Sequence, residues 1–249
     1  MTELADALPP EGHNAILEAL GREARRALED RWSEVELEAQ QPVSAEEEGV
    51  DGLYFPLSCL MCRLVSLPEG TSVKVSLVGR EGMTGASALV DSSVSAFRTV
   101  VQLPGRALFL PRNEAGRLLD LPGVGEILVR YTLLLLRETS LTAACNRAHP
   151  AKERLARWLL LIGDRAGRDE FPLTHESLSA MLGVRRESVT LAAKGLRSAG
   201  AIEYRRATVA ITDRSKLEKE GCSCYPSITE SYTRFLKTEL RDSSQAGRS

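Results

Sequence analysis

This 249-residue sequence has no long apolar segment and no recognisable leader. Its longest apolar stretches, such as residues 133–136, are far shorter than the roughly 20 residues that a membrane-spanning helix needs. Residues 1–12 are acidic and contain no apolar run, so they do not resemble a secretion signal. We therefore expect a cytoplasmic protein with no membrane contact. Its 43% hydrophobic and 27% charged residues are ordinary for a soluble globular chain.

Histidine is scarce, and catalytic motifs are missing. The three histidines are His13, His149 and His175, and none lies in a nucleophile or zinc-protease pattern. His175 is followed at i+4 by Ser179, where a metalloprotease helix would carry a second histidine. The sequence also lacks a G-x-S-x-G elbow and a P-loop. We predict that the protein is not an enzyme and binds no cofactor.

The five cysteines include two close pairs, Cys59 with Cys62 and Cys222 with Cys224. Structural zinc usually takes four ligands, and these pairs could meet only if the C-terminal segment folded back on the N-terminal part. Cys59 and Cys62 lie in a predicted strand, where an odd separation directs side chains to opposite faces. We predict reduced thiols and no metal site. The alternative is a thiol or metal redox sensor, or a thiol oxidoreductase, that uses Cys59 and Cys62.

Charge is unevenly divided along the chain, although the net charge is only −2. Residues 1–149 carry 14 Lys and Arg against 21 Asp and Glu, whereas residues 150–249 carry 18 against 13. An overall balance near zero argues against a general polyanion binder. The basic C-terminal part is the part expected to approach nucleic acid, with an affinity that falls as salt rises.

The most specific motif consists of two short helical patterns joined at Gly183. Thr174 suits the N-cap of the first helix, and Gly183 can take the positive φ of a tight turn. The second helix begins around Arg185, Arg186 and Glu187. A helix-turn-helix presents the first turn of its second helix to base edges in the DNA major groove. Arg and Glu can distinguish base pairs there, so the motif predicts sequence-specific binding of double-stranded DNA.

A predicted hairpin follows the second helix. Two short β-branched runs, residues 201–204 and 208–211, enclose Arg205, Arg206 and Ala207. A hairpin in this place is a wing, and its arginines are within reach of phosphate; the alternative is a surface hairpin with a solvated tip. The residues predicted to contact DNA are Thr174, His175, Arg185, Arg186, Glu187, Ser188, Thr190, Arg205 and Arg206.

The N-terminal half has the pattern of an antiparallel barrel or sandwich. Short β-rich runs separated by Pro- and Gly-containing turns predict strands within residues 53–65, 71–78, 97–103 and 106–110. A brief helix is predicted over residues 111–119.

One long helix is predicted over residues 124–148, because no Gly or Pro interrupts it after Gly125. Apolar and other residues recur at alternating spacings of four and three, which is typical of a coiled-coil seam. These residues are Ile127, Tyr131, Leu134, Glu138, Leu141 and Cys145. We predict that this seam pairs two subunits while another face packs on the barrel; the alternative is a core helix of a monomer. His149 and Pro150 end the helix at a hinge.

The order of predicted elements resembles that of the bacterial Crp/Fnr family of transcription regulators, over roughly residues 12–236. The most specific match is residues 182–190, which read Leu-Gly-Val-Arg-Arg-Glu-Ser-Val-Thr. The family typically has Gly, two residues, and then Arg-Glu-[Ser/Thr]-Val. The resemblance implies an α+β fold: a sensor barrel similar to a cyclic-nucleotide-binding domain (residues 1–120), a dimerisation helix and hinge (121–149), and a winged helix-turn-helix domain with a helical tail (150–249).

The resemblance also implies roles for individual residues. Arg186 would donate two hydrogen bonds to guanine, Glu187 would accept one from cytosine, and Ser188 would contact phosphate. Arg185 stands where the family often has a capping Ser or Thr, and Leu191 stands where it often has a third base-contacting Arg. The implied protein is a homodimer on a pseudo-palindromic operator, with RNA polymerase as a partner. Its barrel either senses an unknown small-molecule effector or serves as a scaffold.

The segment that matches the nucleotide-binding cassette of the family departs from its pattern. Ala86 stands where a ribose-binding Glu is usual, and Phe97 stands where a phosphate-binding Arg is usual. Arg98 is adjacent, but a shift of one residue on a strand turns the side chain to the opposite face. We therefore expect a regulator that does not depend on a cyclic nucleotide.

Overall fold

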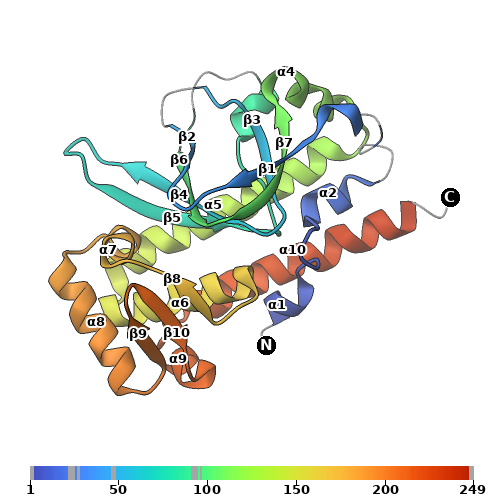
Figure 1. Ribbon diagram of the computed structural model, residues 1–249. Coiled ribbons are helices and arrows are strands. Elements are labelled where there is room, and N and C mark those ends of the chain that lie inside the picture. The colour runs from blue at the N-terminus through green and yellow to red at the C-terminus, as the bar shows by residue number, and fades with distance from the viewer. Residues whose placement is uncertain are drawn as a thin grey trace.

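The computed structural model describes residues 3–21, 26, 29–45, 49–90, 95 and 97–246. A body of β-strands lies above a group of C-terminal helices, and the long helix α5 runs between them (Figure 1). Two short helices open the described chain, α1 (Glu3–Ala7) and α2 (Ala15–Ala19), and the single turn η1 (Glu29–Arg31) precedes the first strand.

The strands of the N-terminal part form two facing antiparallel sheets. They are β1 (Ser33–Leu37), β2 (Pro42–Ser44), β3 (Gly52–Pro56), β4 (Leu60–Ser66), β5 (Ser72–Val78), β6 (Arg98–Leu103) and β7 (Gly105–Pro111). One sheet has the order β1-β7-β3 and the other the order β2-β6-β4-β5. This jelly-roll arrangement confirms the predicted antiparallel barrel or sandwich, with two open sheets. The predicted run 53–65 is divided between β3 and β4, and β1 and β2 were not predicted.

Alternating side chains from both sheets fill the space between them. One cluster consists of buried residues from β1, β2, β4, β5, β6 and β7: Leu37, Val43, Met61, Val78, Val101 and Ala107, together with Cys59. The half-buried Val35 and Tyr54 pack against it. Burying one face of each sheet is what holds two antiparallel sheets together.

Helical segments close the jelly roll and lead into the C-terminal part. They are η2 (Ala86–Val90), α4 (Arg112–Ala115), η3 (Gly116–Asp120) and α5 (Val124–Ala148). The brief helix predicted after the last strand is therefore present as α4 and η3. The C-terminal part contains α6 (Ala151–Ala166), β8 (Glu170–Pro172), α7 (His175–Leu182), α8 (Arg186–Ser198), β9 (Ile202–Arg205), β10 (Thr208–Ile211), α9 (Arg214–Glu220) and α10 (Cys224–Ala246).

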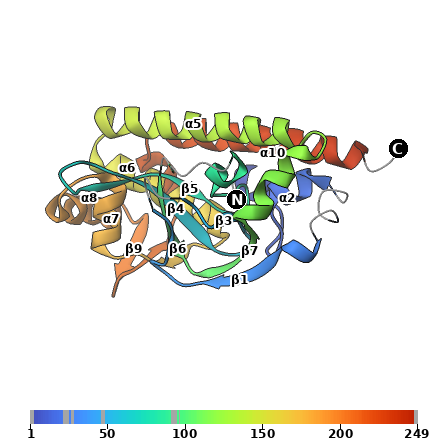
Figure 2. The ribbon, with the colours of Figure 1, turned by 90° about the horizontal axis from the view of Figure 1, so that it is seen from above.

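The final helix, α10, lies alongside α5 (Figure 2). The two helices are antiparallel: Arg137 Nε donates to Ser231 Oγ at 2.9 Å, while Tyr131, earlier on α5, packs against Phe235, later on α10. The predicted C-terminal helical tail thus folds back against the helix that was expected to pair two subunits.

The predicted dimer seam on α5 is wrong, because most of it is buried inside the subunit. Tyr131, Leu134, Glu138 and Cys145 are at most 8% exposed. Ile127 and Leu141, the other two residues of the predicted seam, are only half-buried and pack against the same core. The jelly roll and α10 cover most of this side of α5, so its four buried residues cannot pair with a second copy.

A different face of α5 remains exposed. Val129, Leu133 and Leu136 are 60%, 59% and 61% exposed, although all three are large apolar residues. Ser140 and Ala143 extend this row with the same alternating spacing of four and three. The exposed row is displaced by two residues from the predicted seam, which moves it to the opposite side of the helix.

Helix α6 is the centre of the molecule, since every residue from Arg154 to Arg165 along it is buried. It contacts α7, α8, α9 and α10 as well as β4 and β5. A helix buried on all sides normally carries apolar residues throughout. Here four of its buried side chains are charged: Arg154, Arg157, Asp164 and Arg165.

Arg165 connects four parts of the chain. Its Nη1 and Nη2 atoms donate to the two carboxylate oxygens of Glu138 on α5, at 3.2 and 3.1 Å. Its Nε lies 3.1 Å from Glu81, and its Nη1 also donates to the carbonyl of Leu77 on β5. The guanidinium stacks 4.6 Å from the ring of Tyr232 on α10, whose hydroxyl donates to Glu138 at 2.5 Å.

Electrostatics keep this buried group charged. Burial alone opposes the charge of Arg165, but attraction from Glu138 and Glu81 raises the pKa of its guanidinium overall. Burial, with Glu138 close by, raises the pKa of Tyr232 well above its ordinary value, so its hydroxyl remains a donor. The arrangement therefore consists of one cation between two carboxylates, with a phenol that donates to one of them.

Polar contacts also join the helix-turn-helix to the jelly roll. Lys74 on β5 is only 3% exposed, and its Nζ donates to Gln102 at 2.5 Å and to Ser177 on α7 at 2.7 Å. Burial lowers the pKa of this lysine. Arg154 donates to the carbonyl of Leu182 at the end of α7 at 2.9 Å. The part of the chain that contains α7 is therefore held against β5.

None of the helices in the described part of the chain combines the length and the apolar character that crossing a lipid bilayer requires.

We predict that Arg165→Met destabilises the protein by about 3–5 kcal/mol, because it leaves the carboxylates of Glu81 and Glu138 buried without a cation. Denaturant-induced unfolding followed by circular dichroism measures this change. The additional substitutions Glu81→Gln and Glu138→Gln are expected to restore part of the loss, since they remove the unpaired charges. Arg98→Met, at an exposed site on β6, is the control and is expected to change stability by less than about 0.5 kcal/mol. A similarly small effect of Arg165→Met would contradict the role given to this residue.

Candidate nucleic-acid interface

Local sequence signals position α7. The hydroxyl of Thr174 accepts from the backbone N–H of Ser177 at 3.1 Å, which confirms the predicted N-cap. Leu173 and Leu178, each 1% exposed, flank this cap and pack in the core. Gly183 ends the helix with φ +59°, a left-handed conformation that favours glycine. The turn between the two helices is therefore where the sequence predicts it.

Helix α8 buries one side and exposes the other. Val189, Ala192, Ala193 and Leu196 form its buried stripe, and the small alanines allow close approach to α6 and α7. Arg185 occupies the N-cap position, and the part of the chain that the structure describes supplies no side-chain hydrogen bond to this cap. The first backbone N–H groups of α8 thus remain available, and such groups bind anions such as phosphate.

The exposed first turn of α8 carries the residues predicted to read bases. Arg185, Arg186, Glu187 and Thr190 are exposed, whereas Ser188 is half-buried. Arg186 is 70% exposed and lies 3.9 Å from Glu176, a solvent-exposed ion pair that contributes little. The hydroxyl of Thr190 donates to the carbonyl of Arg186 at 3.0 Å. The structure thus presents the guanidinium and the carboxylate without burying either.

Two further basic residues share this surface, and the sequence prediction missed them. Lys194 and Arg197 are exposed, and helical spacing places them on the same side of α8 as Arg186 and Thr190. Continuing along the helix from Arg186 through Thr190, by steps of four and then three residues, would have identified both. A basic row along the outside of α8 is suited to phosphates beyond the bases that the first turn would reach.

The predicted wing is present as the β9–β10 hairpin. The strands pair Thr208 with Arg205 at the tip, and β10 also pairs with β8 to form a three-stranded antiparallel sheet. Arg206 and Ala207 have φ +48° and +62°, so the turn needs two left-handed residues, a conformation usually taken by Asn or Gly. Strained non-glycine backbone often occurs at functional sites. Here it projects Arg205 and Arg206 from the end of the hairpin.

An aromatic contact connects this wing to α7. The rings of His175 and Tyr204 stack with centroids 5.0 Å apart, and the hydroxyl of Tyr204 donates to the carbonyl of Leu173 at 3.0 Å. Burial raises the pKa of Tyr204, so the phenol stays a donor. His175, the first residue of α7, therefore joins this helix to the wing.

The jelly roll differs from a nucleotide-binding barrel in several ways. Ala86 is exposed on η2, and Arg98 is exposed while its neighbour Thr99 is 1% exposed. Arg98 therefore points away from the interior, as the sequence predicts. A buried arginine does lie inside: Arg63 on β4 donates to the carbonyl of Met83 at 2.9 Å and lies 5.7 Å from the ring of Phe97. No sequence motif singled out Arg63.

Cys59 and Cys62 do not form a reactive pair. Cys59 packs between the two sheets, whereas Cys62 belongs to the main core, and both thiols are free. Burial raises the pKa of Cys59 to about 12 and that of Cys62 to about 11, so both remain thiols at neutral pH. This environment does not favour the redox alternative, which requires an accessible thiolate.

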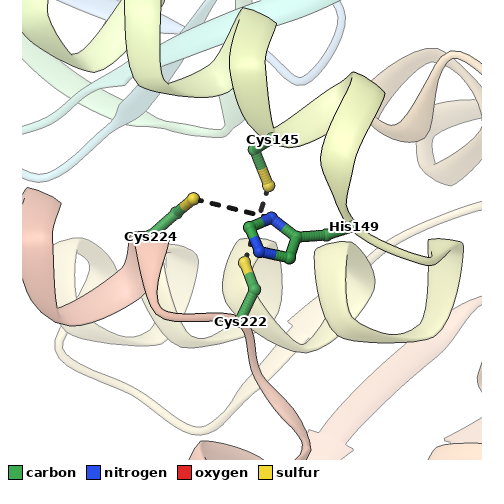
Figure 3. A group of neighbouring side chains, drawn as sticks. All are labelled: Cys145, His149, Cys222 and Cys224. Carbon is green, nitrogen blue, oxygen red and sulfur yellow. Dashed lines mark hydrogen bonds between the residues drawn. The ribbon is translucent and has the colours of Figure 1, made fainter.

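From the sequence, Cys222 and Cys224 are possible ligands together with Cys59 and Cys62. In the structure they lie beside Cys145 and His149 instead. Together with Cys145 and His149 they form a cluster at the end of α5 (Figure 3). Cys145 and His149 are four residues apart on one helix, a spacing that could have indicated a ligand pair. The sequence prediction of no metal site did not consider this combination.

Comparisons with known proteins agree with this arrangement. Residues 153–220 match the family model described as a Crp-like helix-turn-helix domain. A CRP-like cAMP-activated global transcriptional regulator of Mycobacterium tuberculosis is 25% identical over 216 residues, which cover 83% of this chain and 96% of that protein.

Two solved structures show the same fold. FixK2 from Bradyrhizobium japonicum superposes with a TM-score of 0.65 at 16% identity, covering 77% of this chain and 98% of that one. A CRP-family transcriptional regulator of Thermus thermophilus superposes with a TM-score of 0.60 at 22% identity, covering 75% and 95%. Both likenesses extend well beyond the helix-turn-helix, so the jelly roll, α5 and the C-terminal domain together have the fold of these regulators.

Proposed function

We propose that this chain, a Crp/Fnr-type transcription regulator, recognises a specific double-stranded DNA sequence through the first turn of α8. The observation that carries the proposal is the exposure of Arg186 and Glu187 side by side at the start of a helix whose opposite side is buried. The protein would act by binding DNA, with RNA polymerase as the partner that links binding to transcription.

Base recognition rests on the geometry of α8. In the major groove Arg186 would donate two hydrogen bonds to the acceptors of guanine, and Glu187 would accept from the amino group of cytosine. Such contacts supply specificity, whereas phosphate contacts supply position and most of the salt-dependent affinity. Arg185, Ser188 and the exposed Arg206 of the wing would contact phosphate.

A homodimer would form through the exposed row of α5. Val129, Leu133 and Leu136 are three large apolar residues in one continuous row, and such contiguous exposure marks an interaction surface. Arg137, Ser140 and Leu141 border a shallow groove next to Leu133 and Leu136. Alternating four and three spacing lets the same row of a second copy interdigitate with this one. Two-fold pairing would direct the two α8 helices to the half-sites of a pseudo-palindromic operator.

Control by a cyclic nucleotide is not expected for this chain. Ala86 offers no acceptor for a ribose hydroxyl, and the side chain of Tyr131 packs directly on Gly82. The hydroxyl of Tyr131 exchanges hydrogen bonds of 3.1 Å with the backbone of Met83, so these groups are already satisfied. An effector of other chemistry, if the jelly roll binds one, would have to use different groups.

The first prediction concerns base specificity. Arg186→Ala is expected to weaken binding by about 1–3 kcal/mol at one base-pair position of each half-site, while other positions keep their preference. Arg206→Ala is expected to weaken the binding of all duplexes alike. It should also reduce the slope of the logarithm of the binding constant against the logarithm of salt concentration by about one. Fluorescence anisotropy with a set of single-base operator variants measures both. An unchanged base preference in Arg186→Ala would show that this residue does not read the sequence.

A second prediction concerns assembly. Leu133→Glu is expected to convert dimers to monomers, because two carboxylates would face each other in an apolar interface. Val90→Glu, at a site on η2 that is 70% exposed and away from α5, is the matched control and should leave the dimer intact. Sedimentation equilibrium distinguishes the two states. A Leu133→Glu protein that stays dimeric would place the interface elsewhere.

A third prediction concerns cyclic AMP, which activates the M. tuberculosis relative according to its name. Adding cyclic AMP is expected to leave the operator affinity of this chain unchanged, because Ala86 offers no acceptor for the ribose and a nucleotide that does not bind cannot shift the equilibrium. Titration of operator DNA with and without the nucleotide, with the M. tuberculosis protein measured in parallel, provides the test. An increase in affinity would overturn the proposed independence.

A further inference from the structure

Four side chains that ligate metals converge where α5 ends (Figure 3). One candidate ligand atom from each of Cys145, His149, Cys222 and Cys224 lies within 4.8 Å of all the others. The Sγ atoms of Cys145 and Cys222 are 3.5 Å apart, and Sγ of Cys224 is 3.7 Å from Nδ1 of His149. The set consists of three sulfurs and one imidazole nitrogen.

These separations suit a single tetrahedral ion. Zinc binds cysteine sulfur at about 2.3 Å and histidine nitrogen at about 2.0–2.1 Å, so neighbouring ligand atoms around one ion lie about 3.5–3.8 Å apart. The observed distances of 3.5 and 3.7 Å fall in this range. In an iron–sulfur cluster at least two of the protein ligands bind different irons and lie farther apart, whereas here all four candidate ligand atoms lie within 4.8 Å of one another. The geometry therefore favours one ion over a cluster.

The backbone holds each pair of ligands in place. Cys145 and His149 are four residues apart at the end of α5, so their side chains lie on the same side of the helix. His149 leaves the helix in an extended conformation while its N–H still donates to the carbonyl of Cys145 at 3.0 Å. Cys224 is the first residue of α10, and Cys222 lies two residues before it. The N–H of Tyr225 donates to the carbonyl of Cys222 at 3.1 Å.

Burial and access also suit a metal ion. The three cysteines are at most 8% exposed and form a small separate cluster. His149 and Cys222 also line a surface pocket of about 480 Å³, through which an ion can enter. Lys152 and Glu220 line the same pocket and form an ion pair with each other. The carboxylate of Glu220 is therefore already neutralised by Lys152 and does not compete with the four ligands for the ion.

We propose that Cys145, His149, Cys222 and Cys224 form a four-ligand site for a divalent transition-metal ion of the zinc class. The ion would connect the end of α5 and the hinge at Pro150 to the segment between α9 and α10. It would thereby fix the hinge that leads into the DNA-binding part and the start of the helix that covers α5. This assignment does not depend on which DNA sequence the protein binds.

Titration of the reduced, metal-free, full-length protein with Co²⁺ tests the site, because Co²⁺ takes the place of Zn²⁺ and reports its ligands by absorption. We expect one Co²⁺ per chain, with thiolate-to-metal charge-transfer bands and the visible bands of tetrahedral coordination. Zn²⁺ is expected to displace Co²⁺ and abolish these bands. Hydrogen exchange in residues 145–152 and 221–226 should slow when Zn²⁺ is bound.

Variants separate this site from other thiols. Cys224→Ser is expected to lower Co²⁺ affinity at least 100-fold, more than the roughly 10–100-fold that loss of a residue supporting a ligand costs. His149→Cys keeps four ligands, so it should retain tetrahedral Co²⁺ with stronger charge-transfer absorption. Cys59→Ser, in the jelly roll, is the matched control and should bind like the unaltered protein.

Three results would overturn the proposal. The first is a stoichiometry well below one ion per chain in a protein whose circular dichroism shows it to be folded. The second is an octahedral Co²⁺ spectrum without thiolate bands, or binding that Cys224→Ser leaves unchanged. The third is a protein that forms a disulfide between Cys145 and Cys222 in air and, after reduction, takes up no metal; that result would assign the cluster to thiol oxidation instead.

Discussion

The structure depends on how two buried charges of α6, Arg165 and Asp164, are paired. The side chain of Arg165 has no exposed surface; it forms ion pairs with Glu138 on α5 and with Glu81 after β5, and it stacks on the ring of Tyr232 on α10. Asp164 is paired in the same way with Arg214 on α9 and with the hydroxyl of Tyr225 at 2.7 Å. Because an unpaired charge in such an interior is strongly destabilising, these contacts specify how the jelly roll, α5 and the C-terminal part are joined.

These charge pairs hold α6 in place, and α6 in turn supports α8, whose charged side remains exposed. Helix α6 provides the surface on which α8 packs its alanines and leucine, so Arg186 and Glu187 need no partner within the protein. The contact between Lys74 and Ser177 fixes α7 against β5 at the other side. A ligand or ion that altered β5, the hinge or the start of α10 would act on these same contacts. Such a change would therefore be transmitted to the position of α8.

Local features could be predicted from the sequence, whereas long-range packing could not. The cap at Thr174, the turn at Gly183 and the hairpin around Arg206 depend on neighbouring residues, and the structure has all three. The dimer seam failed because α5 carries two rows with the same spacing, and only the position of α10 shows that Tyr131 is covered and Leu133 exposed. The cluster of Cys145, His149, Cys222 and Cys224 was missed because Cys145 and Cys222 are 77 residues apart.

Selection of bound duplexes from a random-sequence pool by the full-length protein at moderate ionic strength, with and without Zn²⁺, tests the central claim that α8 reads DNA bases. The account predicts enrichment of a pseudo-palindrome whose half-sites lie about 34–36 Å apart, one turn of the double helix, with a G·C pair at an equivalent position in each half. A selected pool that remains indistinguishable from the random input in both conditions would contradict it.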